Sequence, residues 1–436
     1  MKRRLLPILM TLVLVCALPI WAAFVTSGDV TDPLVSTAEA SEPLKLEEVS
    51  TADDLRAKIT NGKSVKLMAD ISITSTLEIA KSLTLDLNGH VLKMTGSGSV
   101  LKVSGRATLT ITDSRPQNPH TEPYVGLPAG GVITGGEGTN VTGIYYVGGA
   151  VFLENDTTLK LEGGTITENS SSGGSVFISG EKAVFEMSGG TITGETVGVR
   201  NNVGTFTMTG GRITGCSDRG VYMFNGSMTM SGTAYIGGNP GAGEDIYVRE
   251  PVHKHTDLSV TGGTVEGNVR IEFGANLGMT QESLKPVANS VVKEGGVFEG
   301  HIQVRIDNTE GTSVDYNTVN FIDEVAKTRT LQLVLADKKA TRPTDPATVN
   351  GQTFMYWAKE GTSEEWDFVA EIKEAITLYA VRTPASSGGY YYYPTTDTKA
   401  DDAKGSPKTA DPGVALYAAL SLLSLTGLTC TARKKF

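Results

Sequence analysis

The chain has 436 residues, of which 20% are charged, and its formal net charge is −10. This acidic balance argues against nucleic-acid binding, because phosphate backbones attract basic surfaces. Three cysteines are present. Cys16 and Cys430 lie in apolar terminal segments, so an exported mature chain would keep only Cys216 and could form no internal disulfide.

The N-terminus has the composition of a secretion signal. Lys2, Arg3 and Arg4 precede an apolar run from Leu5 to Val25, which contains the small residues Ala22 and Ala23. This order predicts a signal peptide over residues 1–25 and a linker over 26–50. An uncleaved membrane anchor is the alternative reading of the same apolar run.

A short amphipathic helix is predicted from Thr51 to Ile59, with Thr51 as its N-cap. Short segments of alternating apolar residues follow it, and they are typical of half-buried strands. These segments are 65–68, 71–73, 77–79, 83–87 and 109–111. The helix would cover the open end of a stack of strands, which otherwise exposes an unpaired edge.

A ten-residue phrase then recurs, with copies at 159–168, 185–194 and 206–215 and degraded copies at 228–237, 258–267 and 291–300. All copies except the last have apolar residues at their first, third and eighth positions, and most have a Gly-Gly pair between two strand-like halves. One such phrase cannot bury its apolar face alone. Stacked copies can, so the repeat predicts a solenoid.

The period of the repeat favours a β-helix over a propeller. Gly189, Gly210 and Gly232 are separated by steps of 21 and 22 residues, whereas a propeller blade needs roughly 40. A second strand type lies between the phrases, at 151–153, 176–178, 197–199, 221–223 and 246–248. We therefore predict an all-β chain with a right-handed parallel β-helix over 51–311. Its interior would contain Leu161, Met187, Ile192 and Met208.

The segment 51–306 resembles the pectin-lyase-like β-helices of bacterial surface proteins. The resemblance rests on Asp54-Leu55-Arg56-Ala57, on 65–71, on Leu83-Thr-Leu-Asp-Leu-Asn-Gly-His90 and on the Gly-Gly-Thr-Ile-Thr phrases. It implies the fold and leaves the activity open, because adhesins and polysaccharide-cleaving enzymes share this scaffold.

One outward face of the second strand type is a candidate ligand-binding site. If Val176 and Ile178 point inward, the residue between them points outward, and the same phase holds in the other copies. In this predicted row of outward side chains, Gly198 leaves one position without a side chain, and the arginines would hydrogen-bond a ligand. We call the row the predicted stripe, and it consists of Phe152, Phe177, Tyr222, Phe224, Tyr247, Arg200 and Arg249. Alternatively, the aromatic side chains stabilise the stack or lie beneath a loop such as 237–244.

No catalytic constellation is predicted. The candidate acids in Glu154…Asp156, Asp218-Arg219 and Glu244-Asp245 lie in apparent turns of different coils, where acids usually form turn hydrogen bonds. His253 and His255, with Asp257 nearby, suggest a metal-binding site. A solvated loop is favoured, because the sequence does not fix the position of a third ligand beside the two histidines. We therefore predict no catalytic residues, no metal and no cofactor.

Residues 318–383 interrupt the repeat and predict a small β module. Strand-like segments at 319–322 and 331–335 precede Gly351–Trp357 and Ile376–Ala380, an order that resembles the Listeria–Bacteroides repeat, which is a β-grasp-like module. The usual Asn-Gly-Gly is missing, and Val381-Arg382 stands where the family often has Trp. We expect Trp357, Trp366 and Tyr379 to form its core.

Residues 384–413 have the composition of a stalk linker and end in a candidate sorting motif, formed by Ser406, Pro407, Lys408, Thr409, Ala410 and Asp411. Residues 414–436 provide an apolar span and a basic tail. This order resembles a Gram-positive cell-wall sorting signal, which implies a sortase transpeptidase and peptidoglycan as partners, with Thr409 as acyl donor. Ser406 stands where the common sorting motif has Leu, and Ala410 stands where it has Gly. A plain membrane anchor is the alternative.

These features together predict an exported adhesin-like protein at the cell surface, anchored in the wall or the membrane. Its ligand would be a carbohydrate or another molecule of a host surface or matrix. A polysaccharide lyase or glycoside hydrolase on the same scaffold, and a passive spacer, are the alternatives.

Overall fold

The computed structural model describes residues 45–141, 143, 145–240, 244–250, 257–273, 296–306 and 313–384. The predicted signal peptide, the sorting motif and the C-terminal apolar span lie outside these ranges. Within them, no helix is both long and apolar enough to cross a membrane.

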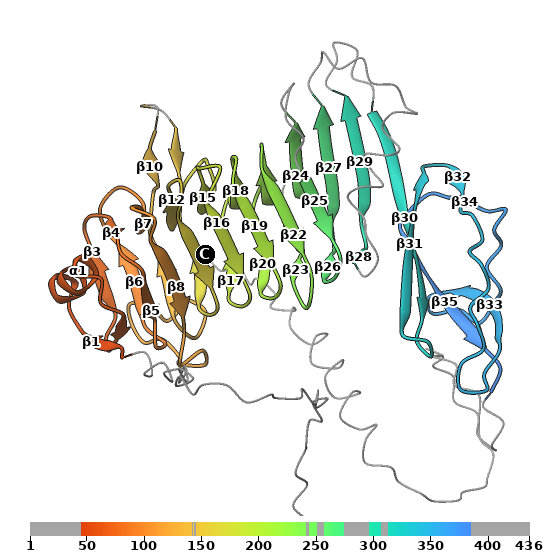
Figure 1. Cartoon of the computed structure of the whole chain (residues 1–436), viewed down its shortest axis with the longest axis horizontal. Coiled ribbons are helices and arrows are strands. Elements are labelled where there is room, and N and C mark those ends of the chain that lie inside the picture. Colours follow the sequence, from red (N-terminus) through yellow and green to blue (C-terminus); the bar gives the residue numbers. More distant parts are fainter. Residues whose placement is uncertain are drawn as a thin grey trace, which may run out of the picture. The chain divides into compact units, whose positions relative to one another are not determined.

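Three parallel sheets form the walls of a β-helix, and successive coils contribute one strand to each sheet in the order A, B, C (Figure 1). Sheet A consists of β1 (Glu47–Val49), β2 (Val65–Leu67), β5 (Leu83–Asp86), β8 (Thr108–Thr112), β13 (Thr158–Leu161), β16 (Val184–Met187), β19 (Thr205–Met208), β22 (Ser227–Met230) and β25 (Asp257–Val260). The predicted parallel solenoid is therefore confirmed, and its first strand begins at Glu47, within the segment predicted as linker.

Sheet B consists of β3 (Ile71–Ile73), β6 (Val91–Met94), β9 (Val132–Thr134), β14 (Thr165–Thr167), β17 (Thr191–Thr193), β20 (Arg212–Thr214), β23 (Tyr235–Ile236), β26 (Thr264–Val265) and β28 (Val297–Phe298). The coil strands of sheet C are β4 (Leu77–Ile79), β7 (Leu101–Val103), β12 (Val151–Leu153), β15 (Val176–Ile178), β18 (Val197–Asn201), β21 (Arg219–Met223), β24 (Glu244–Glu250), β27 (Asn268–Phe273) and β29 (His301–Ile306).

Apolar ladders fill the interior of the coils. Leu161 pairs with Met187 and Met187 with Met208 in sheet A, and Ile166 pairs with Ile192 in sheet B. All of these side chains are at most 1% exposed, so the predicted core is confirmed. Alternation with a period of two sends every second side chain of a strand inward, and parallel stacking then places like residues on top of one another.

The two glycines of the repeated phrase have different physical roles. A Cβ atom on Gly189, the first glycine of its pair, would lie 2.2 Å from the carbonyl oxygen of Glu162 in the preceding coil. The second glycine, Gly190, has a φ of +71°, a conformation that side chains disfavour. The Gly-Gly pair therefore allows close stacking and a sharp turn between sheets A and B.

The helix α1 (Ala52–Thr60) covers the N-terminal end of the coils, as predicted. The backbone N–H of Asp54 donates to the hydroxyl of Thr51 over 3.3 Å, which makes Thr51 the N-cap. Leu55 and Ile59 are buried in the solenoid core, and Arg56 donates to the carbonyl oxygen of Thr76 over 2.9 Å. The helix thereby shields the apolar interior of the first coil from water.

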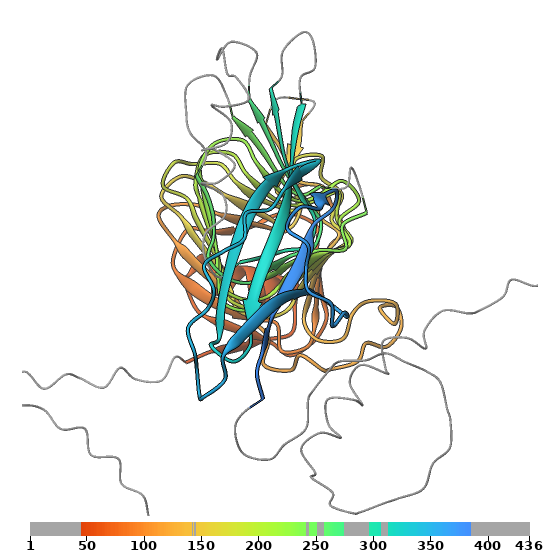
Figure 2. The ribbon, with the colours of Figure 1, turned by 90° about the vertical axis from the view of Figure 1, so that its right-hand side faces the viewer.

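The strand β30 (Ser313–Asp323) belongs both to the solenoid and to the C-terminal module. One edge of β30 pairs first with β29 and then with β35 (Ile376–Arg382), and the other edge pairs with β31 (Thr328–Leu335). Figure 2 shows these strands in front of the end of the coils. Tyr316 lies in the solenoid core, so β30 closes its C-terminal end. The predicted start of the module at residue 318 thus falls within a continuous strand.

The four longer strands of the module follow the order β31–β30–β35–β33, where β33 spans Phe354–Lys359. The central pair, β30 and β35, is parallel, and both outer pairs are antiparallel. This is the strand order of a β-grasp sheet, as predicted, although the described residues 313–384 contain no helix. The short strands β32 (Lys338–Lys339) and β34 (Glu371–Ile372) form a separate antiparallel pair.

The core of the module differs in one residue from the prediction. Trp357 is buried and meets Phe321 edge-on, with ring centroids 5.1 Å apart, and Trp366 packs against the same cluster. Tyr379 is only half-buried and lies outside the cluster, because alternation along β35 sends Leu378 inward. The prediction of Tyr379 as a core residue was therefore wrong.

Candidate functional site: the outer face of sheet C

The register of sheet C places the predicted aromatic residues in one outward row. Phe152 pairs with Phe177, and Tyr222 pairs with Tyr247. Arg200 lies between these two pairs, opposite both Phe177 and Tyr222. Stacking of the coils therefore brings together residues that are almost a hundred positions apart in the sequence.

The predicted gap at Gly198 was wrong. Val176 pairs with Val199, two residues beyond the expected partner Val197, so Arg200 occupies the place between Phe177 and Tyr222. A shift of two residues keeps the apolar side chains inside, so alternation alone cannot distinguish the two registers. Gly198 instead lies where a Cβ atom would approach the carbonyl oxygen of Gly220 to 2.7 Å.

The first part of the stripe is covered, which corrects the prediction of a continuous exposed face. Phe152 and Phe177 are only 8% and 6% exposed, and their rings stack with centroids 5.6 Å apart. Val147 and Tyr145 pack against them. Val147 belongs to a hairpin formed by β10 (Thr139–Asn140) and β11 (Tyr146–Val147). Phe152 and Phe177 therefore stabilise this hairpin and offer no platform for a ligand.

Tyr247 is also buried, and it is held by charged neighbours. Its ring lies 5.0 Å from that of Tyr222, and the guanidinium of Arg219 lies 4.3 Å above it. Its hydroxyl donates to the carboxylate of Glu272. Burial, followed by this hydrogen bond, raises the pKa of Tyr247. Tyr247 thus remains protonated at neutral pH. Its buried ring is better suited to hold Tyr222 in place than to contact a ligand.

Ion pairs connect the coils around Tyr247. Glu244 accepts from Arg219 over 3.1 Å and from Arg270 over 2.7 Å, and Arg270 also contacts Glu272. The side chain of Glu244 is almost completely buried. A buried carboxylate that binds two arginines is satisfied by its own neighbours, so it is a poor candidate for a catalytic acid or base.

Four residues of the predicted stripe remain accessible to solvent, and we call them the sheet C cluster: Arg200, Tyr222, Phe224 and Arg249. Arg200 donates to the hydroxyl of Tyr145, and its guanidinium lies 4.5 Å from the centre of the Tyr222 ring. Arg249 is exposed, and a hydrogen bond to Tyr222 raises its pKa. The ring of Tyr222 is thus placed between Arg200 and Tyr247 and remains partly accessible to solvent.

The remaining acid pairs do not converge on a cleft. Glu154 binds Lys102 over 2.8 Å, and Asp156 lies 3.6 Å from Lys182. Asp245 is buried and accepts from Asn239 over 2.6 Å. His253 and His255 lie outside the described residues. Within the part of the chain that the structure describes, no three His, Cys, Asp or Glu side chains are grouped as metal ligands.

Sequence reasoning missed a polar corner inside the coils. The third residue after the buried Ile of sheet B is Asn169, Glu195, Cys216 or Asn239 in successive coils. All four are buried, and Asn169 donates to Glu195 from its backbone N–H over 3.1 Å and from its side-chain amide over 3.0 Å. The constant spacing from Ile was visible in the sequence and could have identified this corner.

Burial governs the chemistry of this corner. It raises the pKa of Glu195 to about 7, although the hydrogen bonds from Asn169 act in the opposite direction. It also raises the pKa of the Cys216 thiol to about 12, with a smaller effect from Glu195. Cys216 is a free, buried thiol that remains protonated and unreactive at neutral pH.

The arrangement of the sheet C cluster is therefore suited to binding through polar donors on a rigid, stacked scaffold. Comparison of the chain with protein-family models, with curated proteins and with solved structures gives no match.

Proposed function

We propose that the protein is an exported, surface-displayed adhesin-like β-helix that binds glycan through the sheet C cluster. The observation that supports this proposal is the pair of solvent-accessible arginines, Arg200 and Arg249, beside Tyr222. Arg200 has no carboxylate partner among the residues that the structure describes, and Arg249 is exposed. Such donors favour a ligand that supplies acceptor oxygens.

Glycans match this surface because they present many hydroxyl oxygens along an extended chain. Parallel strands of successive coils repeat every ~4.8 Å, so the cluster offers donors along a line. Guanidinium groups donate several hydrogen bonds in a fixed geometry, which gives orientation as well as attraction. Phe224 adds a partly exposed apolar surface beside Tyr222.

The binding proposal is tested with Arg249→Ala and Phe224→Ala in the purified chain on a glycan array. We expect each variant to bind at least about tenfold more weakly to any glycan that the wild type retains, which corresponds to roughly 1.4 kcal/mol. Thermal unfolding should change little, because both side chains are accessible. Lys160→Ala on sheet A is the matched control, because the side chains of Lys160 and its partner Glu186 are also partly exposed.

Normal glycan binding by both variants would contradict the proposed site. Cleavage of a retained glycan by the wild type would favour the lyase or hydrolase alternative. If the wild type retains no glycan or matrix ligand, the spacer alternative is favoured.

We further propose that the chain is joined to the cell wall through the sorting motif, with Thr409 as acyl donor. A peptidoglycan hydrolase should then release the protein from cells, whereas detergent alone should not. Thr409→Ala should move most of the protein to the detergent-soluble or secreted fraction. An unchanged distribution of this variant would instead indicate that the apolar span and basic tail over 414–436 serve as a plain membrane anchor.

A further inference from the structure

A second candidate site lies at the corner between sheets A and B. The Gly-Gly phrase leaves this corner without side chains at several positions, so the surface is hollowed there. A pocket of about 400 Å³ is lined by Arg212, Gly232, Thr233, Ala234, Tyr235, Gly262, Gly263, Thr264 and Arg329. Each coil passes through A, B and then C, so this corner lies opposite the face that carries the sheet C cluster.

Two arginines from distant parts of the chain meet in this pocket. Arg212 begins β20, and Arg329 is the second residue of β31 in the C-terminal module. The guanidinium of Arg212 lies 3.8 Å from the centre of the Tyr235 ring. Neither arginine side chain forms a hydrogen bond or an ion pair with a described residue, whereas Arg219, Arg270 and Arg382 each bind carboxylates.

The acid next to the pocket already has a partner. Glu266 accepts a hydrogen bond from the hydroxyl of Tyr235, at the far end of the ring on which Arg212 stacks. Burial and this hydrogen bond raise the pKa of Tyr235 to about 12, so its hydroxyl stays protonated at neutral pH. Glu266 thus anchors Tyr235, and Tyr235 in turn holds the guanidinium of Arg212 at the pocket.

Two cationic side chains that line one pocket make it attractive to an anion. Guanidinium groups match carboxylate, sulfate and phosphate oxygens with paired hydrogen bonds. The volume of the pocket is at the lower end of the range for small-molecule sites and exceeds what a bare ion needs. Thr233 and Thr264 add hydroxyl groups that suit the hydroxyls of a sugar.

We propose that this pocket binds an acidic sugar unit, with Arg212 and Arg329 holding its oxyanion group. The acidic group would be the carboxylate of a uronic acid or the ester of a sulfated or phosphorylated sugar. Because the pocket contains no residue of the sheet C cluster, this inference is independent of the proposed glycan-binding face. The proposed site also gives a role to the contact between the solenoid and the module, because the solenoid supplies Arg212 and the module supplies Arg329.

Ligand-observed NMR with the full purified chain tests this assignment. Glucuronate and galacturonate should bind, as should a sulfated or phosphorylated sugar if its ester is accepted. Glucose, galactose and glucuronamide, which lack the charge, should bind at least about tenfold more weakly. Binding of the acidic sugars should weaken as salt is raised, because a solvent-accessible ion pair is screened.

Variants locate the site. Arg212→Gln and Arg329→Gln should each weaken binding of the acidic sugars about tenfold or more, and Arg342→Gln should not. Arg342 is the control because it lies in the same module, is exposed and contacts Asp345 over 3.1 Å. Equal binding of acidic and neutral sugars, no loss in either variant, or binding of inorganic sulfate and phosphate without any acidic sugar would each overturn the assignment. Circular dichroism of both variants should match the wild type, since both side chains are accessible.

Discussion

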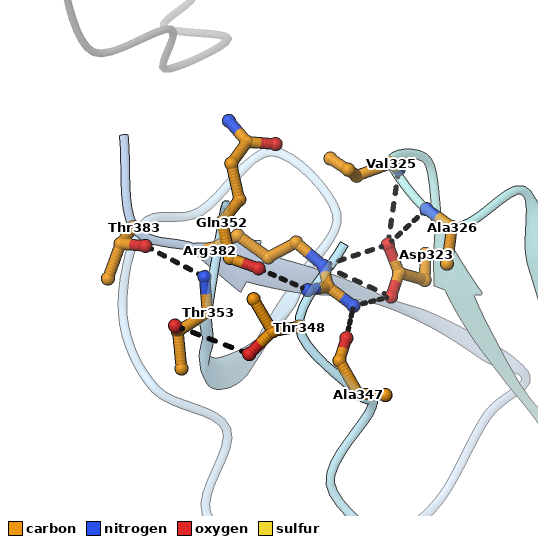
Figure 3. Close-up of polar contacts among 9 residues, drawn as sticks. All are labelled: Asp323, Val325, Ala326, Ala347, Thr348, Gln352, Thr353, Arg382 and Thr383. Atoms are coloured by element: carbon orange, nitrogen blue, oxygen red, sulfur yellow. Dashed lines mark hydrogen bonds and ion pairs between the residues drawn. The ribbon is translucent and has the colours of Figure 1, made fainter. Parts of the chain in front are cut away.

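Arg382→Ala is expected to lower the free energy of unfolding of the C-terminal module by about 3–5 kcal/mol. Arg382 in β35 binds Asp323 in β30 through two nitrogens, and Nη2 lies 2.5 Å from Oδ2 (Figure 3). Both side chains are at most 3% exposed. Removal of the guanidinium would leave a buried carboxylate without its charged partner, which is one of the most costly changes in a protein interior.

Arg382 also connects a loop to the sheet. It donates to the carbonyl oxygens of Gln352 and Ala347, over 2.8 Å and 3.0 Å, as Figure 3 shows. Burial alone would raise the pKa of Asp323, but the hydrogen bonds from Arg382 and from two backbone amides outweigh it and lower the pKa. The stabilisation by this pair is therefore present at neutral pH and is lost as the pH falls through the folded-state pKa of Asp323.

Urea unfolding followed by tryptophan fluorescence measures this effect. The chain has three tryptophans, and both of those beyond the predicted signal peptide, Trp357 and Trp366, lie in the module. Arg342→Ala removes an exposed arginine from the same module and should cost at most about 1 kcal/mol. If both variants unfold at the same urea concentration, the buried ion pair does not stabilise the module as we infer.

Glu195→Gln is expected to abolish a loss of stability of about 3 kcal/mol that the wild type undergoes between pH 4.5 and 8. Burial raises the pKa of Glu195 from 4.5 to about 7, so the folded protein holds this proton more tightly than the unfolded chain does. At roughly 1.4 kcal/mol for each pH unit, this difference corresponds to about 3 kcal/mol. The wild type should therefore lose stability as the pH rises from about 4.5 to 7.

The test is chemical denaturation of the wild type and the variant at several pH values between 4.5 and 8. Glutamine has a similar shape and cannot ionise, so the difference in stability should grow with pH and then level off above 7. Glu186→Gln is the matched control, because Glu186 lies in the same coil, has a side chain that is 45% exposed and pairs with Lys160 over 2.9 Å. A constant difference between the Glu195 variant and the wild type at all pH values would contradict a raised pKa.

The sequence by itself determined the class of fold. Alternating apolar residues identified the strands and their inward faces, and the recurring Gly-Gly pairs identified the turns between them. Thr51 and the following residues predicted the capping helix. The strands of the module were also visible in the sequence, and their observed pairing has the predicted β-grasp-like order. All of these features are local, because hydrophobic periodicity and turn residues can each be recognised in a segment of about ten residues.

Only the tertiary structure decided which outward residues are accessible. Alternation with a period of two does not distinguish registers that differ by two residues, so it misplaced Arg200 relative to Phe177. It also cannot show where an insertion folds, and the hairpin of β10 and β11 buries Phe152 and Phe177.

The pairing of Arg382 with Asp323, and the meeting of Arg212 with Arg329, depend on strands far apart in the sequence. The strong pKa shift of Glu195 likewise arises from its depth in the coil. Local pattern determines whether a side chain points inward or outward. Its neighbours, its burial and its charge state follow from how distant segments pack.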